Sequence, residues 1–460
     1  MAVVTGYDAV VVGAGCAGLS AAARLAQAGA RVLVLEAKSR LGGRATAFAD
    51  RETGEVVDNG QHVLLGCYNA TFEFLGEIGA LEHVRVQRQL AVTMIDRRGQ
   101  RSRLVCPSLP APLHLLAGVC DWDGLAWRDK LSARRMATPL SLARRQLRGG
   151  AAIAASPGET VDAWLVRNGQ TARIREMLWH PLALAALNQP AEIAAAPTFA
   201  RVLAEMFEGD SGTGREPAAL VLPTVPLHLM YAEPAKRYIE ARGGQVRTGV
   251  TARVVVEADA VTSVSAGGEA INADVVIAAV PWFGLSELFE GEPRPLAAVL
   301  ANARRMASSP IVTVNLWFDR PVLDEPFIGL PGRAMQWVFD KRAIFGGEAS
   351  HLSLVSSGAS ALVAETNQAL IERAYAELLE ALPECRTAHL VRATVVREPR
   401  ATFSLAPGQP PRPQSATPVR GLWLAGDWID TGLPATIESA VRSGHQAARL
   451  ALETRLGTGN

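Results

Sequence analysis

Three glycines and one carboxylate near the N-terminus are spaced so that they could hold a phosphate-bearing nucleotide. Gly13, Gly15 and Gly18 form a G-x-G-x-x-G run, and Glu36 follows 18 residues after its last glycine. In such a run the first glycine allows a tight turn, the second lets the backbone approach a pyrophosphate, and the third lets a helix pack closely on a strand. A carboxylate at this distance can bind the ribose hydroxyls of an adenosine. The four residues therefore predict a dinucleotide site.

Those residues need a strand, a turn, a helix and a second strand to bring them together, and the flanking sequence supplies this order. Residues 7–12 and 31–35 are apolar runs typical of buried strands, and residues 19–28 predict a helix that stops at Gly29. The N-terminus of that helix offers free N–H groups and a partial positive charge to the pyrophosphate. A lone G-x-G-x-x-G is weak evidence for a dinucleotide site. Its position between a predicted strand and a predicted helix, with an acid at the end of the next strand, makes the prediction specific.

Two further glycine-containing blocks could complete the same site. Residues 40–44, Arg-Leu-Gly-Gly-Arg, set cations beside bare backbone N–H groups, an arrangement suited to phosphate, although alone they also fit a surface turn. Near the C-terminus, residues 422–427 read as a buried strand ending in Gly-Asp. A helix then runs to about residue 450, with Thr436 as its N-cap and Glu438 in its first turn.

Together these three blocks resemble the FAD-binding amine oxidase and phytoene desaturase superfamily. The resemblance implies an α/β fold, with a Rossmann-type FAD-binding domain of the amine oxidase kind and an inserted mixed α+β substrate domain. It implies FAD as the cofactor, with the ribityl-phosphate region near Asp427 and the pyrophosphate near Arg44. The expected FAD-binding residues are Gly13, Gly15, Cys16, Ala17, Gly18, Glu36, Ala37, Gly43, Arg44, Gly60, Gln61, His62, Ala252, Gly426, Asp427, Ala435, Thr436 and Ile437.

The domain organisation follows from how these blocks are separated. We expect FAD-binding sequence at 1–89, 220–292 and 392–460, and substrate-domain sequence at 90–219 (mostly helical) and 293–391. Prolines at 139 and 181 should kink or restart two of the helices. The expected helices are 127–147, 160–168, 171–187, 197–207 and 361–382, and the expected later strands are 250–257, 260–265, 274–280, 311–318, 337–339 and 351–356.

Three longer segments, 58–68, 179–188 and 433–444, narrow the resemblance. They are similar to the squalene-associated FAD-dependent desaturases, a group whose assigned activity is hydroxysqualene dehydroxylation. The similarity extends over nearly the whole chain, with Ala183 and Gln189 as small departures. It implies that a hydrophobic C30 isoprenoid, the allylic alcohol hydroxysqualene, loses its hydroxyl and gains a hydride from reduced FAD. The product would be squalene, on the route to hopanoids.

The acid that such a reaction needs has two candidates in the sequence. His62 is the first, because the resemblance places it near the flavin ring, although a packing histidine that is hydrogen-bonded to the backbone is the more ordinary interpretation. His180, with Asn188 eight residues later, is the second; Pro181 lies between them, and they would share a helical face only approximately. Trp317 and Trp337 either line a substrate tunnel or fill the core, and we favour the core.

Three other functions remain open on the sequence. A carotenoid-type desaturase would use oxidised FAD to remove hydride from a polyene. An amine oxidase would carry a lysine near the flavin and an aromatic cage, for which the sequence gives no clear signal. An escort protein that has lost its flavin would show damaged FAD motifs, whereas Gly13, Glu36 and Asp427 are intact.

Composition limits the classes of partner and the cellular location that the protein can have. The 460 residues carry a net charge of +1, so no concentrated basic surface indicates nucleic acid. The five cysteines are scattered without a C-x-x-C, which argues against a metal site or a disulfide framework and fits a cytoplasmic location. The N-terminus does not resemble a signal peptide, and no apolar run predicts a membrane span.

Residues 104–127, rich in Leu and Trp, would suit either an amphipathic patch on the inner face of the membrane or a buried helix pair. Nothing in the residues indicates an oligomeric state.

Overall fold

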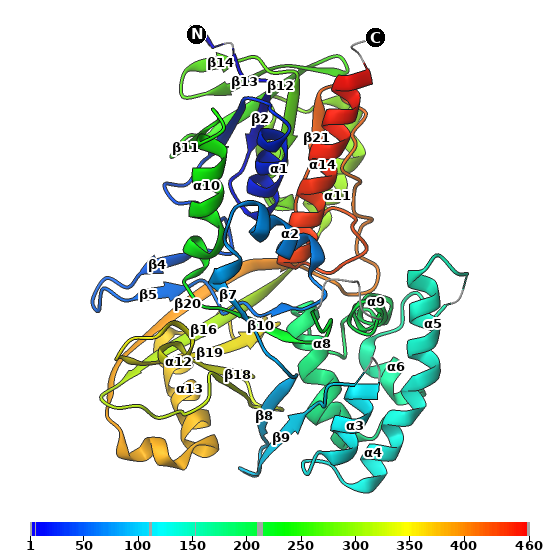
Figure 1. Ribbon diagram of the computed structural model, residues 1–460, viewed down its shortest axis with the longest axis vertical. Coiled ribbons are helices and arrows are strands. Elements are labelled where there is room, and N and C mark those ends of the chain that lie inside the picture. The colour runs from blue at the N-terminus through cyan, green and yellow to red at the C-terminus, as the bar shows by residue number, and fades with distance from the viewer. Residues whose placement is uncertain (1, 5, 110–112, 152, 209–214, 458–460) are drawn as a thin grey trace.

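The computed structural model describes residues 2–4, 6–109, 113–151, 153–208 and 215–457. Figure 1 shows an elongated molecule in which both chain termini lie at one end, beside a parallel sheet, while a mixed sheet and a group of helices form the other end. The chain passes between the two ends several times. Each end is therefore assembled from segments that are far apart in the sequence.

The parallel sheet has five strands in the order β11-β3-β2-β15-β21. Its two central strands are wholly apolar and buried until Glu36 ends β3, as expected for a parallel sheet covered on both faces. This confirms the predicted α/β fold with a Rossmann-like sheet. The bounds of the strands are β2 (Ala9–Val12), β3 (Val32–Glu36), β11 (Gln245–Thr248), β15 (Val275–Ala278) and β21 (Leu422–Leu424).

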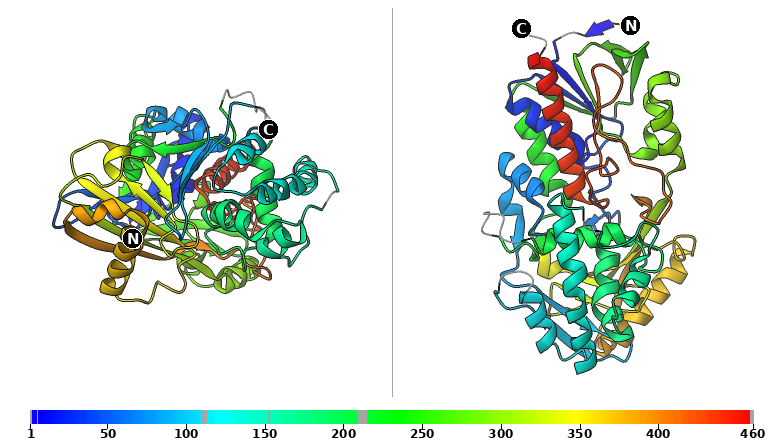
Figure 2. Two further views of the ribbon diagram at one scale, coloured as in Figure 1. Left: turned by 90° about the horizontal axis from the view of Figure 1, so that it is seen from below. Right: turned by 90° about the vertical axis from the view of Figure 1, so that its right-hand side faces the viewer.

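Two long helices from opposite ends of the sequence pack side by side against this sheet (Figures 1 and 2). They are α1 (Cys16–Gln27) and α14 (Ile437–Gly457). Gly444 permits the contact, because a Cβ there would lie 2.3 Å from the Ala17 carbonyl oxygen. Thr436 caps α14 as predicted, with its Oγ1 accepting the Ser439 N–H at 3.1 Å. The α1 helix begins three residues earlier than expected, because Gly15 leads straight into it.

A small sheet covers the outer end of the parallel sheet, in the order β1-β14-β13-β12. Strands β12 and β13 match the runs expected at 250–257 and 260–265, whereas β14 was not expected and the run expected at 274–280 is β15 of the parallel sheet. Residue 252 opens β12 and lies on the side that returns to the parallel sheet. The bounds are β1 (Ala2–Val4), β12 (Ala252–Glu257), β13 (Ala260–Ala266) and β14 (Glu269–Ile271).

A seven-stranded mixed sheet organises the other end of the molecule, in the order β20-β16-β19-β18-β17-β8-β9. It corrects two expectations. Strands β8 and β9 come from the block expected to be mostly helical, and β20 runs across the expected boundary at residue 391. Strands join a sheet by register and not by chain order, so composition could not show this. The bounds are β8 (Ala91–Ile95), β9 (Arg101–Val105), β16 (Ser308–Phe318), β17 (Phe327–Gly329), β18 (Trp337–Asp340), β19 (Ser350–Ser357) and β20 (Leu390–Phe403).

Helices pack beside this sheet, and the two prolines act on them as predicted. The expected helix 127–147 breaks at a 3-10 turn, Arg134–Met136, and restarts with Pro139 in its first turn. The expected helix 171–187 contains a π-helical stretch, Arg175–Trp179, just before Pro181, which lacks the N–H that a regular ladder needs. The bounds are α3 (Leu113–Asp121), α4 (Trp127–Ala133), α5 (Ala137–Leu147), α6 (Val161–Arg167), α7 (Ala172–Ile174), α8 (His180–Leu187), α9 (Ala196–Met206) and α13 (Asn367–Ala381).

The remaining elements lie between the two ends of the molecule or pack on one of them. Strand β10 pairs with β6 and β7, and β4 pairs with β5. Within the described ranges, no helix is both long enough and apolar enough to cross a bilayer. The bounds are β4 (Ala47–Ala49), β5 (Val56–Asp58), β6 (Leu64–Leu65), β7 (Val84–Val86), β10 (Leu220–Pro223), α2 (Asn69–Glu77), α10 (Glu233–Glu240), α11 (Ala297–Arg305) and α12 (Lys341–Phe345).

Candidate cofactor and substrate site

One cavity of about 500 Å³ brings together nearly all the residues singled out in the sequence. It lies at the carboxyl ends of the parallel strands, the usual ligand position in such sheets, and reaches β16, β19 and β20 of the mixed sheet. Every residue expected to bind FAD lines it except Gly18. The structure thus places three distant parts of the chain around one space.

The glycine turn closes one end of this cavity, and each glycine has a separate steric reason. Gly13 has a φ of +107°, and a Cβ there would lie 2.5 Å from the Ala279 carbonyl oxygen. A Cβ on Gly18 would lie 1.9 Å from the Gly13 oxygen, so Gly18 serves the packing of helix on turn and does not face the cavity. The nearest atom to a Cβ on Gly15 would be the Gly43 Cα, at 4.0 Å. Gly15 therefore leaves bare backbone on the cavity wall.

Glu36 marks the same end of the cavity, at the last position of β3. Its carboxylate accepts the Ala14 N–H at 2.8 Å and the Lys38 N–H at 2.9 Å, which fixes its position and leaves further lone pairs for hydroxyl donors. The Val250 N–H donates to the Glu36 carbonyl, and Val250 and Ala252 line the cavity beside it. A carboxylate between two backbone segments suits a ribose and its base.

Arg44 links three parts of the chain at the middle of the cavity. Its guanidinium donates to the Asp427 carboxylate at 2.5 Å and to the Ala401 carbonyl at 2.7 Å. The Asn59 side-chain amide donates to the Arg44 carbonyl at 3.0 Å and to Glu398 at 3.2 Å. The positive charge of Arg44 is thus partly balanced by Asp427, and backbone N–H groups remain to bind phosphate.

His62 stands further along the cavity wall, and its ring has a defined tautomer. Its Nδ1 lies 3.2 Å from the Gly60 carbonyl oxygen. Because a carbonyl can only accept, Nδ1 carries the proton and Nε2 is an acceptor in the neutral ring. Burial lowers the pKa of His62 below its ordinary value. Neutral His62 is therefore better suited to accept a hydrogen bond than to supply a proton.

A buried ion pair behind the cavity holds the loop that carries His62. The Lys341 ammonium, at the start of α12, donates to the Asp58 carboxylate at 2.8 Å and also to the Gln61 side chain. Only 5% of the Lys341 side chain and 1% of the Asp58 side chain are exposed. The two residues are 283 positions apart, and no pattern in the sequence pairs them.

Several side chains at the mixed-sheet end of the cavity were not singled out as binding residues. Among them Tyr68 and Asn188 lay inside quoted motifs without an assigned role, whereas Glu398 and Thr402 carried no recognisable signal. Their position depends on the register of β20 and on the conformation of the loop after α8. Neither of these can be predicted from the sequence pattern. The cavity-lining residues that were missed include Tyr68, Ala186, Asn188, Ile311, Val355, Glu398 and Thr402.

Other candidates lie away from the cavity. His180 contacts Asp162 at 2.9 Å and does not line the cavity, although Asn188 does, so the suggested pairing of these two is wrong. Trp317 stacks on the His351 ring at 4.2 Å between ring centroids, and Trp337 packs against Phe327. Neither tryptophan lines this cavity, in line with the preference for the core.

Comparison with known proteins identifies the family of this chain. A family model described as flavin-containing amine oxidoreductase matches residues 16–452. The chain belongs to this family. Its cofactor is FAD, and the bare glycine turn, the ribose-sized carboxylate site and the cavity between them fit such a dinucleotide.

Relatives of this flavin oxidoreductase include proteins of several kinds. It is 32% identical to the hydroxysqualene dehydroxylase of Rhodopseudomonas palustris, over 96% of this chain and 97% of the relative. It is 27% identical to a 15-cis-phytoene desaturase of Narcissus pseudonarcissus, over 96% of this chain and 79% of the relative. A solved putrescine oxidase superposes with a TM-score of 0.71 at 20% identity, covering 98% of this chain and all of that one. This last likeness shows the fold alone.

Proposed function

We propose that this flavin oxidoreductase removes the allylic hydroxyl of hydroxysqualene, a C30 isoprenoid, to give squalene. The observation that carries the proposal is the end-to-end match to a hydroxysqualene dehydroxylase, which covers 97% of that relative at 32% identity. The match to the phytoene desaturase leaves about a fifth of that relative uncovered. The motifs at 58–68 and 433–444 support the same assignment, since both border the cavity.

The residues around the cavity would hold FAD in an extended form. In this proposal Glu36 binds the adenosine ribose, the turn at Gly13 and Gly15 faces the pyrophosphate, and Asp427 faces the ribityl-phosphate region. The backbone at Thr436 and Ile437 faces the pyrimidine edge of the flavin. The domain division given above remains part of the proposal, with β20 shared between its last two segments.

Three demands of the reaction match features of the cavity wall. The allylic carbon has to be held over the flavin, the leaving hydroxyl needs a hydrogen-bond or proton donor, and water must be kept from the allylic cation. Apolar side chains such as Ile311, Val355 and Ala186 line the cavity and would serve the first and third demands. When bound and reduced, FAD supplies the hydride. The chain's own residues orient the substrate and handle the proton.

We also propose that a face of α3 and α4 rests on the membrane where such a substrate dissolves. Leu113, Trp127 and Leu131 are 55%, 69% and 43% exposed. Arg134 and Arg135 are exposed beside them and would meet anionic headgroups. The expected segment 104–127 is only partly involved, because Trp122 and neighbouring apolar residues are buried in the core, and residues 110–112 lie outside the described residues.

A carotenoid-type desaturase is the second candidate, favoured by the 27% identity to a phytoene desaturase. It would use the same cavity in the opposite redox direction. An amine oxidase is less well supported: in the part of the chain that the structure describes, the phenyl and phenol rings lining the cavity come from Phe283 and Tyr68, which do not amount to a cage. Lys341 is engaged with Asp58 outside the cavity lining.

An anaerobic single-turnover assay tests the proposal. Photoreduced holoprotein is mixed with hydroxysqualene and followed by flavin absorbance and product mass. Flavin reoxidation with stoichiometric squalene is the expected result. A flavin that stays reduced would overturn the dehydroxylase assignment, and the oxidised protein would then be offered phytoene, where coloured conjugated products would establish desaturation.

A further inference from the structure

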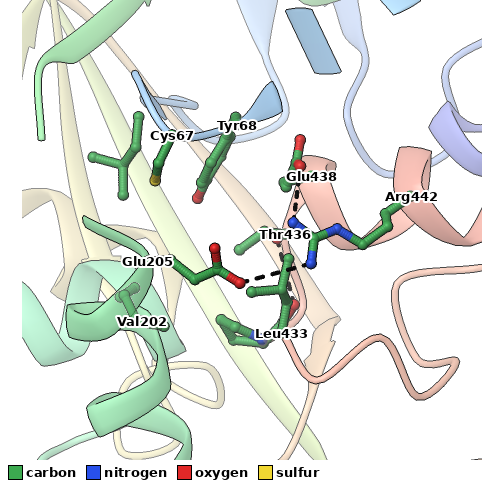
Figure 3. A pocket seen from close by; sticks show the side chains of 11 residues that line it. Cys67, Tyr68, Val202, Glu205, Leu433, Thr436, Glu438 and Arg442 are labelled. Atoms are coloured by element: carbon green, nitrogen blue, oxygen red, sulfur yellow. Dashed lines mark hydrogen bonds and ion pairs between the residues drawn. The ribbon is translucent and has the colours of Figure 1, made fainter. Parts of the chain in front are cut away.

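A second, smaller pocket adjoins the main cavity, and a few polar side chains reach into its largely apolar lining. Its volume is about 20 Å³, enough for one water molecule. Figure 3 shows the Tyr68 hydroxyl, the Glu205 carboxylate and the Arg442 guanidinium directed toward the same small space. These groups come from three separate elements: the residue before α2, helix α9 and helix α14. The known motifs assign no role to this pocket.

Tyr68 is the side chain that connects the two spaces. It lines both the small pocket and the main cavity, as do Thr436 and Ala186. The Thr436 side chain, at the cap of α14, lies beside the Tyr68 hydroxyl. Burial raises the pKa of Tyr68 well above its usual value, so the phenol keeps its proton at physiological pH. Tyr68 is therefore a protonated phenol that lines the main cavity.

Charged residues hold the far side of the small pocket in place. Glu205 pairs with Arg201 at 2.9 Å and with Arg442 at 3.7 Å. Arg442 also pairs with Glu438 at 3.4 Å, and the Glu438 carboxylate accepts the Thr71 N–H at 2.9 Å. The network fixes the start of α14 against α2.

This network is also open to exchange with solvent. The Glu205 and Arg442 side chains are 21% and 34% exposed. A water held between Glu205 and Tyr68 would have charged and polar partners on both sides, which is what an ordered water requires. The small pocket is thus lined by groups that solvent also reaches.

We infer that Tyr68 donates the proton to the leaving hydroxyl of the substrate, and that the water pocket beside Glu205 restores it. The inference rests on the proposed dehydroxylase function. The C–O bond breaks with its electron pair going to oxygen, and that oxygen takes the Tyr68 proton and departs as water. Reduced FAD, when bound, would supply the hydride that the allylic carbon takes up and would thereby lose two electrons. Tyr68 then regains one proton from solvent through the pocket water.

His62 is the competing donor, and its geometry argues against that role. The Gly60 carbonyl occupies the protonated Nδ1, which leaves Nε2 as an acceptor. A second proton on the ring would have to be added in a buried position. Tyr68 already carries its proton, and giving it up leaves a buried phenolate that the pocket water must reprotonate. The test below separates the two residues.

The first measurement is binding to the oxidised holoprotein, which needs no turnover. Hydroxysqualene and squalene are titrated separately in detergent micelles, and the flavin absorbance shift is recorded. Tyr68→Phe should weaken hydroxysqualene binding about 10-fold and leave squalene binding unchanged, because only the first ligand carries a hydroxyl. Equal effects on both ligands, or no effect on either, would overturn the inference.

The second measurement is single turnover with two leaving groups. For Tyr68→Phe, we expect flavin reoxidation by hydroxysqualene to slow by about 100-fold or more. The allylic fluoride analogue, whose leaving group departs without a full proton, should recover most of that loss. Glu205→Gln should slow hydroxysqualene turnover by a smaller factor, about 10-fold. A purely structural role for Tyr68 would slow both substrates alike.

Controls keep the possible failures apart. Tyr7→Phe removes a phenolic hydroxyl that donates to Gln245, outside both cavities, and should leave all rates unchanged. Full activity of Tyr68→Phe together with loss of activity in His62→Gln would transfer the donor role to His62 and overturn the inference. If wild-type protein neither binds nor converts hydroxysqualene, the proposed function itself is wrong. The flavin content of each variant shows that it has folded.

Discussion

The end of the cavity at the glycine turn and the end at the mixed sheet differ in how the chain supplies their atoms. At the glycine turn, the first 44 residues supply backbone N–H groups and one carboxylate, and residues 250–252 and 279–284 complete the wall. At the mixed sheet, side chains such as Tyr68, Asn188 and Glu398 come from segments hundreds of residues apart. The first end is a local motif, and the second exists only after folding.

The comparison shows what each kind of construction demands of the sequence. A backbone site restricts residue types at fixed spacing, because glycine is needed wherever a Cβ would collide with the turn. A side-chain site restricts only the final position of each group. Cofactor binding can therefore be predicted from the sequence, whereas the residues that act on the substrate are brought together only by packing between distant elements. Four predictions test this contrast, in order of decreasing effect.

The largest effect should come from the ion pair that joins the two ends. Lys341→Met leaves the buried Asp58 carboxylate without its partner, and we expect the free energy of unfolding to fall by about 3–5 kcal/mol. Chemical denaturation of the holoprotein measures it. The double variant Asp58→Asn with Lys341→Met should regain much of the loss. A fall below about 1 kcal/mol would mean that the cavity ends are not coupled through this pair.

The next effect tests the backbone construction at the glycine turn. Gly18→Ala would force a Cβ to within 1.9 Å of the Gly13 oxygen, so we expect about 2 kcal/mol lower stability and loss of bound FAD. Gly29→Ala is the matched control, because its φ of +85° is strained but nothing lies within 4 Å. It should cost about 1 kcal/mol and retain flavin. Thermal unfolding and flavin absorbance distinguish the two variants.

A smaller effect is expected from the one side chain that the local motif supplies. Glu36→Ala should raise the FAD dissociation constant about 10-fold, since a charged hydrogen-bond acceptor is lost beside the ribose. Equilibrium dialysis of apoprotein with FAD gives the constant. Glu257→Ala, an exposed carboxylate on β12, serves as control. Unchanged affinity of the Glu36 variant would remove this residue from the binding site.

The smallest effect concerns the surface near the mixed-sheet end. Arg134→Gln should reduce binding to vesicles containing phosphatidylglycerol about fivefold, since one basic residue near an anionic surface contributes about 1 kcal/mol. Sedimentation with neutral and anionic vesicles measures the difference. Arg253→Gln, exposed on β12 at the opposite end of the molecule, should bind like wild type. If both variants lose affinity equally, the attraction is a general charge effect and the α3–α4 face has no special role.

The helices and strands of the parallel sheet, and the residues gathered at its carboxyl edge, were predictable because their signals are local. An apolar strand, three glycines and an acid at the next strand end allow few other structures. The cap at Thr436 and the restart near Pro139 followed from the same kind of rule. These features depend on steric contacts and hydrogen bonds between residues that are close in sequence. The residue types at those positions are therefore enough to predict them.

Only the tertiary structure decided the rest. The sequence does not say that Lys341 meets Asp58, that Asn188 separates from His180, or that Tyr68 lies between a cavity and a water-sized pocket. Each of these contacts joins elements whose relative position is set by strand register and helix packing. Burial then fixes the tautomer of His62 and keeps Tyr68 protonated. The sequence by itself thus determined the cofactor and its cradle, while folding determined which side chains can act on a substrate, because those groups meet only when distant segments pack.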